Sequence, residues 1–199
     1  MIKIIDYKVG NIHSISNMLK KIKVQSEIIN NFKEINKNDK VILPGVGSYD
    51  DCIFKLKNCN FFDFLKYEIK NLNLKVLGIC LGMQILCNSS EEGTKEGLGF
   101  FPYNCEAFKN QNKFNTVVGW SKTFPYKHDL NKSLLNLDER YYFLHSYYVP
   151  FNSDTILYAQ NFDIKYSAII KKNNIIGCQF HPERSHIYGM EFLKKFSNF

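Results

Sequence analysis

The fold of this chain is decided by residues 76–84, which read Val76-Leu77-Gly78-Ile79-Cys80-Leu81-Gly82-Met83-Gln84. An apolar run that ends at Ile79 predicts a short buried strand, and a helical pattern of apolar residues follows Cys80. Glycines stand two residues before and two residues after the cysteine, as a sharp strand-to-helix turn requires, because only glycine tolerates such close backbone contacts. The turn places Cys80 at a helix N-terminus, where the helix dipole favours a thiolate.

This turn also predicts that the backbone N–H of Leu81 points at the volume in front of the Cys80 sulfur, as half of an oxyanion hole. A cysteine at a strand end is, however, commonly just a small buried apolar residue. We interpret the other five cysteines in that way: Cys52, Cys59, Cys87, Cys105 and Cys178. The turn alone leaves both roles open for Cys80.

Length and cysteine usage bound the class of protein. A chain of 199 residues buries roughly 70% of its unfolded surface, enough for one globular domain over residues 1–199. No apolar run reaches the roughly 18 residues of a membrane span, and the N-terminus reads as a strand rather than a signal peptide. We therefore expect a cytoplasmic protein with reduced thiols and no membrane association. The cysteines form no Cys-x-x-Cys pair, so we expect no structural zinc.

The formal net charge of +7 raises the question of nucleic-acid binding. The lysines are scattered among asparagines and isoleucines, and no basic helix stripe or nucleic-acid motif is present. We expect no nucleic-acid partner; a docking face for an acidic protein explains the charge better.

Short apolar strands alternate with helical patterns over the first ninety residues, which predicts βαβ units on a parallel sheet. The expected strands are residues 1–5, 25–29, 40–43 and 74–79, and the expected helices are around 12–22, 50–56 and 61–72. Residues 91–99 read as a loop. Strands then follow at 104–108, 115–120, 141–149, 154–160, 166–170 and 175–180, before a closing helix at 187–196. The predicted fold is α/β, with a mostly parallel central sheet flanked by helices and a β-rich second half.

A second informative stretch is Phe180-His181-Pro182-Glu183-Arg184. Pro182 pushes His181 toward an extended conformation, in which residues two apart project to the same side. Glu183 is then placed to hold the imidazole of His181, which could act as a base for a Cys80 nucleophile. We treat the remaining histidines as structural or solvated: His13, His128, His145 and His186.

The two stretches together resemble the class I (triad) glutamine amidotransferases. Three further segments narrow the resemblance to the glutaminase subunits of imidazole glycerol phosphate synthase, over essentially the whole chain: Pro44-Gly45-Val46-Gly47, Gly119-Trp120 and His145-Ser146-Tyr147. The resemblance implies the class I amidotransferase fold and hydrolysis of L-glutamine, without a cofactor or metal. It also implies a heterodimer with a (β/α)8 cyclase subunit, which receives the ammonia through a tunnel in histidine biosynthesis.

The resemblance implies roles for individual residues. Cys80 attacks the glutamine amide, His181 transfers protons and Glu183 orients His181. The oxyanion donors are Leu81 and the loop of Val46 and Gly47, after a peptide turns over. The substrate is held by Gly45, Gln84, Ser146 and Tyr147, and the partner by Trp120 and Arg184. The loop could instead be only a tight turn, and ordinary packing is the alternative for Gln84, Ser146 and Tyr147.

The chain departs from the family pattern near the expected partner face. It reads Thr116-Val117-Val118-Gly119-Trp120-Ser121 where Pro-His-x-Gly-Trp-Asn is usual, and Lys8 stands where glycine is common. Two alternatives therefore stay open. One is a paralogous glutaminase that supplies ammonia to an amidotransferase amidinating a cell-surface sugar. The other is an inactive flavodoxin-like regulatory module, against which the intact Cys80, His181 and Glu183 argue.

Overall fold

The computed structural model describes residues 1–110, 113–126 and 140–199. Five parallel strands form one half of a nine-stranded sheet, in the order β2-β1-β3-β4-β14. They are β1 (Ile2–Ile5), β2 (Ser26–Ile29), β3 (Lys40–Leu43), β4 (Lys75–Ile79) and β14 (Ile175–Cys178). The order confirms the parallel sheet predicted from the alternating strands and helices.

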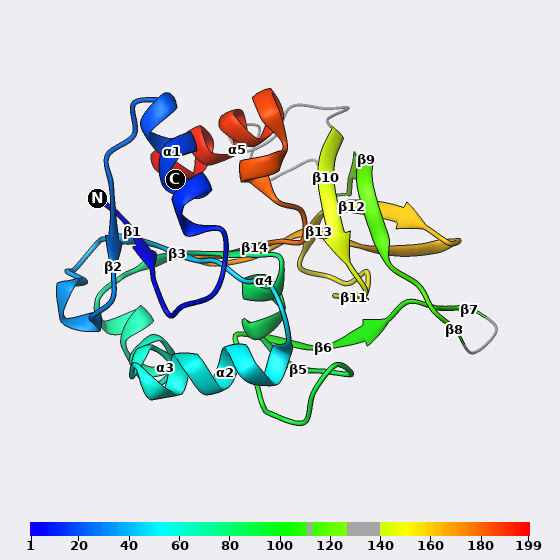
Figure 1. Cartoon of the computed structure of the whole chain (residues 1–199), viewed down its shortest axis with the longest axis horizontal. Helices are drawn as coiled ribbons and strands as arrows, with labels where there is room; N and C mark the ends of the chain where they lie inside the picture. The colour runs from blue at the N-terminus through cyan, green and yellow to red at the C-terminus, as the bar shows by residue number, and fades with distance from the viewer. Residues whose placement is uncertain (111–112, 127–139) are drawn as a thin grey trace.

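Helices cover both faces of this half, which is why its central strands are continuously apolar. Ile4 and Ile42 face α1 (Ile12–Lys21) and α5 (His186–Asn198), above the sheet in Figure 1. The neighbouring residues Ile5, Val41 and Leu43 face α2 (Tyr49–Asn58) and α3 (Phe61–Asn71) on the other side. Successive side chains of a strand point to opposite faces, so each short strand contributes to two hydrophobic cores.

The sheet continues beyond β14 with four antiparallel strands, in the order β14-β13-β12-β9-β10. They are β9 (Val117–Pro125), β10 (Arg140–His145), β12 (Thr155–Asn161) and β13 (Ile164–Lys172). The remaining strands form two small sheets: β5 (Cys87–Ser90), β6 (Phe101–Ala107) and β11 (Tyr147–Tyr148), and β7 (Lys109–Asn110) with β8 (Lys113–Phe114). Three short helices complete the described chain: η1 (Phe32–Glu34), α4 (Leu81–Ile85) and η2 (Pro182–Arg184). The β-rich second half is confirmed.

Two of the differences between the structure and the sequence prediction concern β5, β10 and β11. The strand expected at 141–149 breaks at Ser146, because β10 pairs with β9 whereas β11 pairs with β6 in another sheet. The strand β5, from Cys87 to Ser90, follows α4 directly and was not predicted. Its polar residues gave no alternating pattern. His128 lies outside the described residues. No helix within the described ranges is long and apolar enough to cross a membrane.

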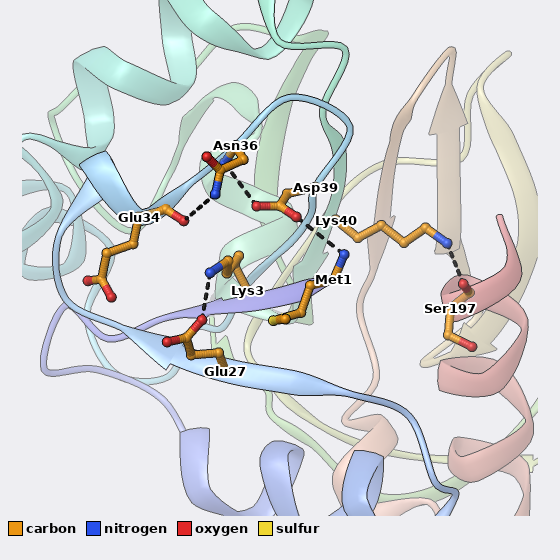
Figure 2. A network of polar contacts seen from close by, with 8 residues as sticks. All are labelled: Met1, Lys3, Glu27, Glu34, Asn36, Asp39, Lys40 and Ser197. Atoms are coloured by element: carbon orange, nitrogen blue, oxygen red, sulfur yellow. Dashed lines mark hydrogen bonds and ion pairs between the residues drawn. The ribbon is translucent and has the colours of Figure 1, made fainter.

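Polar contacts close the amino ends of the parallel strands (Figure 2). The N-terminal ammonium of Met1 lies 3.2 Å from Asp39, whose other oxygen accepts a hydrogen bond from the backbone N–H of Asn36. The Lys40 ammonium donates to the carbonyl of Ser197 near the end of α5. A partly exposed ion pair such as Met1–Asp39 contributes little net stability. These contacts instead tie the N-terminus and the end of α5 to the sheet. The opposite, carboxyl end of the strands is left for a ligand.

Candidate active site

Cys80 occupies a strained turn between β4 and α4. Its φ of 51° and ψ of −110° lie outside the regions that most residues adopt. A Cβ added to Gly78 would stand 2.6 Å from the carbonyl oxygen of Gly82, and one added to Gly82 would stand 2.1 Å from that of Leu43. Neither position admits a side chain. The glycine spacing therefore reports a real steric requirement, and the sharp strand-to-helix turn is confirmed.

His181 follows β14, the strand that pairs in parallel with β4, so it lies beside Cys80 although the two are distant in sequence. Its backbone N–H donates to the carbonyl of Tyr142 at 2.9 Å, and its Nδ1 lies 2.9 Å from Oε1 of Glu183. The side chains of His181 and Glu183 are only 4% and 2% exposed. The structure thus brings these three residues together.

The sequence reasoning for Glu183 was wrong in one respect. His181 is extended, with φ −99° and ψ 99°, but Pro182 begins the short 3-10 helix η2 instead of continuing the extended segment. Proline is favoured at a first helical position, since its fixed φ suits the helix and its missing N–H is not needed there. The carboxylate of Glu183 therefore reaches the imidazole from a helical turn.

The protonation of His181 is controlled by its two polar neighbours. Burial alone would lower the pKa of His181, but hydrogen bonds and charge interactions with Cys80 and Glu183 outweigh it and raise the pKa to about 10. The imidazolium is therefore stabilised between the sulfur and the carboxylate. Nδ1 faces the carboxylate, which leaves Nε2 for proton exchange on the Cys80 side.

A cavity of about 210 Å³ opens in front of Cys80, at the carboxyl ends of the strands. This volume suits a ligand of amino-acid size. Eight of the residues singled out from sequence border it: Val46, Gly47, Cys80, Leu81, Gln84, Ser146, Tyr147 and His181. Gly45 packs behind this wall, where a Cβ would meet the backbone nitrogen of Gly82 at 2.3 Å.

Gln84 is held in place by its own amide. Its Nε2 donates to the carbonyl of Tyr147 at 2.9 Å and lies 3.3 Å from Oε1 of Gln179, whose Nε2 in turn lies 3.7 Å from the Cys80 sulfur. Oε1 of Gln84 is buried and has no partner among the described residues. A buried acceptor without a partner is costly, so this oxygen is poised to accept a hydrogen bond from a ligand.

Sequence reasoning missed two polar side chains that border the cavity, Glu92 and His145. Burial raises the pKa of Glu92, which lies in the stretch read only as a loop. His145 is buried; its Nδ1 lies 2.8 Å from the carbonyl oxygen of Tyr147, and burial lowers its pKa to about 3. It is therefore a neutral imidazole with Nδ1–H donating. His145 was treated as structural or solvated although it belongs to the His145-Ser146-Tyr147 segment, and no local pattern identifies Glu92, which reaches the cavity only where distant segments meet.

Trp120 and Arg184 lie outside the cavity, on the outer side of β9 and η2. Trp120 is 45% exposed and stacks on His186 with ring centroids 5.4 Å apart. The guanidinium of Arg184 lies 5.2 Å from the ring centre of Tyr142, which also contacts Trp120 edge to face. These four side chains form one aromatic and cationic surface, which we call the Trp120 surface.

Lys8, a departure from the family pattern, adopts a left-handed conformation with φ 65°. Glycine is the natural residue there, and a side chain costs about 1 kcal/mol. The ammonium and the backbone N–H of Lys8 both bind the carboxylate of Asp6, at 3.0 and 2.9 Å. The lysine is therefore accommodated by local contacts, away from Cys80.

The arrangement is suited to covalent acyl transfer, in which a thiol attacks a carbonyl and an adjacent imidazole moves protons. The described residues contain no group of three or more side chains placed to hold a metal ion.

Comparison with known proteins agrees with this geometry. A family model described as "Glutamine amidotransferase class-I" matches residues 3–198. The chain belongs to the class I glutamine amidotransferases, a family of glutamine-hydrolysing enzymes. A solved structure titled "Crystal structure of glutamine amidotransferase" shares the fold, with a TM-score of 0.72 at 13% identity over 100% of this chain and 99% of that one.

Relatives narrow the family further. The chain is 42% identical over 98% of both chains to "Imidazole glycerol phosphate synthase subunit HisH 2" from Methanococcus maripaludis. It is 38% identical, over 100% of both chains, to "Imidazole glycerol phosphate synthase subunit HisH" from Leptospira interrogans. A HisH subunit from Staphylococcus aureus is 36% identical over 98% of this chain and 95% of its own length.

Proposed function

We propose that this chain is the glutaminase subunit of an imidazole glycerol phosphate synthase. It hydrolyses L-glutamine to glutamate and ammonia, and a (β/α)8 cyclase subunit uses the ammonia to make imidazole glycerol phosphate and AICAR in histidine biosynthesis. The observation that carries the proposal is the buried constellation of Cys80, His181 and Glu183 at a cavity of amino-acid size. Full-length relatives named HisH support the pathway.

In this proposal the Cys80 thiolate attacks the side-chain amide carbon of glutamine, which gives a tetrahedral oxyanion. The His181 imidazolium protonates the departing ammonia, and a glutamyl thioester remains on Cys80. The neutral imidazole then removes a proton from water, whose attack on the thioester releases glutamate and regenerates the thiolate. Glu183 keeps His181 oriented and stabilises its charged form. The raised pKa of His181 supports the imidazolium as the form that protonates the departing ammonia.

Residues of the cavity walls are assigned to two parts of the substrate, the oxyanion and the amino-acid end of glutamine. Leu81 supplies one backbone N–H, and the loop of Val46 and Gly47 supplies the second. The unpartnered Oε1 of Gln84 and the carboxylate of Glu92 are assigned to the amino-acid end of glutamine, whose ammonium needs acceptors. Ser146, whose hydroxyl lies 2.7 Å from that of Thr116, and Tyr147 complete this wall, with Gly45 behind it.

The Trp120 surface is assigned to the cyclase. A half-exposed tryptophan is a natural anchor in a protein interface, and Arg184 adds a cation one residue after Glu183. Docking at Arg184 would therefore act directly on the segment that holds His181. We further propose that residues 1–199 act as one amidotransferase domain, in a cytoplasmic heterodimer without nucleic-acid or membrane partners.

One departure favours a second candidate. Val117 and Ser121 replace a histidine and an asparagine of the family pattern, and they lie on β9, the strand that carries Trp120. A paralogue whose ammonia serves amidination of a cell-surface sugar would show such changes. The same residues would still hydrolyse glutamine, so only the partner distinguishes the two.

The test adds the purified chain to the cyclase subunit of the same cell and follows imidazole glycerol phosphate. Cys80→Ala should abolish synthesis from glutamine and leave synthesis from free ammonium intact, because only the thioester step is lost. The matched control is Cys59→Ala, a half-buried thiol at the end of α2 that does not border the cavity. A cyclase that neither binds the chain nor stimulates its glutaminase would move the assignment to the sugar-amidinating paralogue.

A further inference from the structure

Two buried side chains hold the loop that carries the proposed second oxyanion donor. Tyr7 lies just after β1, and its hydroxyl donates to the carbonyl of Pro44 at 2.5 Å. Cys52 lies in α2, and its thiol donates to the carbonyl of Val46 at 3.5 Å. Both residues are at most 2% exposed. Neither borders the cavity, so each reaches the loop from behind.

The start of the loop is also fixed by close backbone packing. A Cβ added to Gly10 would stand 2.6 Å from the Cβ of Pro44, and one added to Gly45 would stand 2.3 Å from the nitrogen of Gly82. Gly47 differs, because nothing lies within 4 Å of its would-be Cβ. Its φ of 93° belongs to the left-handed region. The loop thus has a tightly packed root and an open tip.

The two side-chain donors act on alternate peptide units. In a trans peptide the carbonyl and the following N–H point in opposite directions. With the Val46 carbonyl turned toward the buried Cys52, the N–H of Gly47 is turned away from Cys52. In the same way, the bond to Tyr7 fixes the peptide between Pro44 and Gly45. Among the described residues, no donor reaches the intervening carbonyl of Gly45.

We propose that Tyr7 and Cys52 are positioning residues for glutamine hydrolysis, which hold the peptide units on both sides of the Gly45–Val46 peptide and leave that unit free to rotate. This inference rests on the proposed glutaminase function. It adds the two residues that keep the oxyanion loop in position. Rotation of the Gly45–Val46 peptide can turn the N–H of Val46 toward the oxyanion without moving the packed root of the loop.

The hydroxyl of Tyr7 is the stronger of the two holds. Burial, together with the nearby Cys52 thiol, raises the pKa of Tyr7 well above its ordinary value, so the hydroxyl keeps its proton. A buried hydroxyl without an acceptor is costly, which makes the bond to Pro44 persistent. A thiol is a weak donor, so Cys52 should contribute less.

The experiment compares Tyr7→Phe and Cys52→Ala with the wild-type chain, alone and with the cyclase subunit. Three quantities are measured: kcat for glutamine hydrolysis, KM for glutamine, and the rate at which chloroacetamide alkylates Cys80, followed by mass spectrometry. Alkylation is a direct displacement at the thiolate and needs no oxyanion hole, so it reports the triad separately. Tyr67→Phe, at a 65% exposed tyrosine of α3, is the matched control.

One oxyanion donor is worth about 10²- to 10³-fold in kcat, and a loosened donor should lose part of that. We expect kcat to fall about tenfold in Tyr7→Phe and about threefold in Cys52→Ala, while KM and the alkylation rate stay within about twofold. Cys52→Ser, which restores a donor, should recover part of the loss.

Two results would overturn the inference. An unchanged or increased kcat in Tyr7→Phe would show that the hold on Pro44 does not position a donor. Parallel changes in kcat, KM and alkylation would show a merely structural role. A wild-type chain that does not hydrolyse glutamine even with its partner would instead refute the proposed function, so the two failures are distinguishable.

Discussion

The buried His145 should make the protein sensitive to mild acid. Its pKa is lowered to about 3 by burial, against an ordinary value of 6.5. Between these two values the unfolded chain binds a proton at this residue and the folded chain does not. The contribution of His145 to the free energy of unfolding is therefore fully present above about pH 6.5 and is lost as the pH falls toward 3. At pH 5 the loss is about 2 kcal/mol, since 1.5 pH units correspond to about 1.4 kcal/mol each.

The assay is urea unfolding at pH 7.5 and pH 5.0, for the wild-type chain and for His145→Asn. Asparagine can keep the donor to the Tyr147 carbonyl but does not titrate, so the variant should lose about 2 kcal/mol less between the two pH values. The raised pKa of His181 acts in the opposite sense, with stability lost as the pH rises from about 6.5 through 10. That contribution is common to both proteins and cancels in the comparison.

His13→Asn is the matched control, because His13 is exposed on α1. It should leave the wild-type difference between pH 7.5 and 5.0 unchanged. The reasoning is refuted if His145→Asn and wild type lose the same stability on acidification. That result would mean that His145 is protonated in the folded protein and adds a positive charge to the cavity.

Three further outcomes are expected. His181→Ala should lower glutaminase kcat by about 10⁴-fold or more, and Glu183→Gln should lower it less, because the imidazole moves protons whereas the carboxylate orients it. Steady-state kinetics of the two variants decides the order. Gly82→Ala should destabilise the fold by about 3 kcal/mol, since its Cβ would meet the Leu43 carbonyl at 2.1 Å. In thermal melts the melting temperature of Gly82→Ala should lie well below that of Gly47→Ala, where only backbone strain opposes the added side chain. Trp120→Ala should weaken cyclase binding by about 2 kcal/mol without changing the melting temperature, and calorimetric titration measures the difference.

The parts of the fold that were predicted from sequence are those whose physical cause is local. The glycines around Cys80 are needed for contacts within a few residues or with the next strand, so their spacing alone revealed the turn. The apolar strands of the parallel half were equally legible, because burial on both faces leaves them continuously hydrophobic.

The parts that were missed depend on where distant segments meet. Glu92 lies in a loop of no particular pattern and borders the cavity only because β5 and β6 carry that loop there. The break at Ser146 separates β10 from β11, and His145 is the last residue of β10, on the buried face of that strand with Tyr141 and Phe143. Two strands that pair with different partners cannot be read from one alternating stretch of sequence.

The parallel pairing of β4 with β14 has a consequence for the making of the protein. Cys80 leaves the ribosome about a hundred residues before His181, and the strand that carries His181 must then insert beside a strand made much earlier. A nascent chain that has not passed Glu183 holds a thiol in a strained turn but no imidazole beside it. In the proposed mechanism, which needs His181 beside Cys80, glutamine hydrolysis can therefore begin only after the antiparallel half has been synthesised and docked.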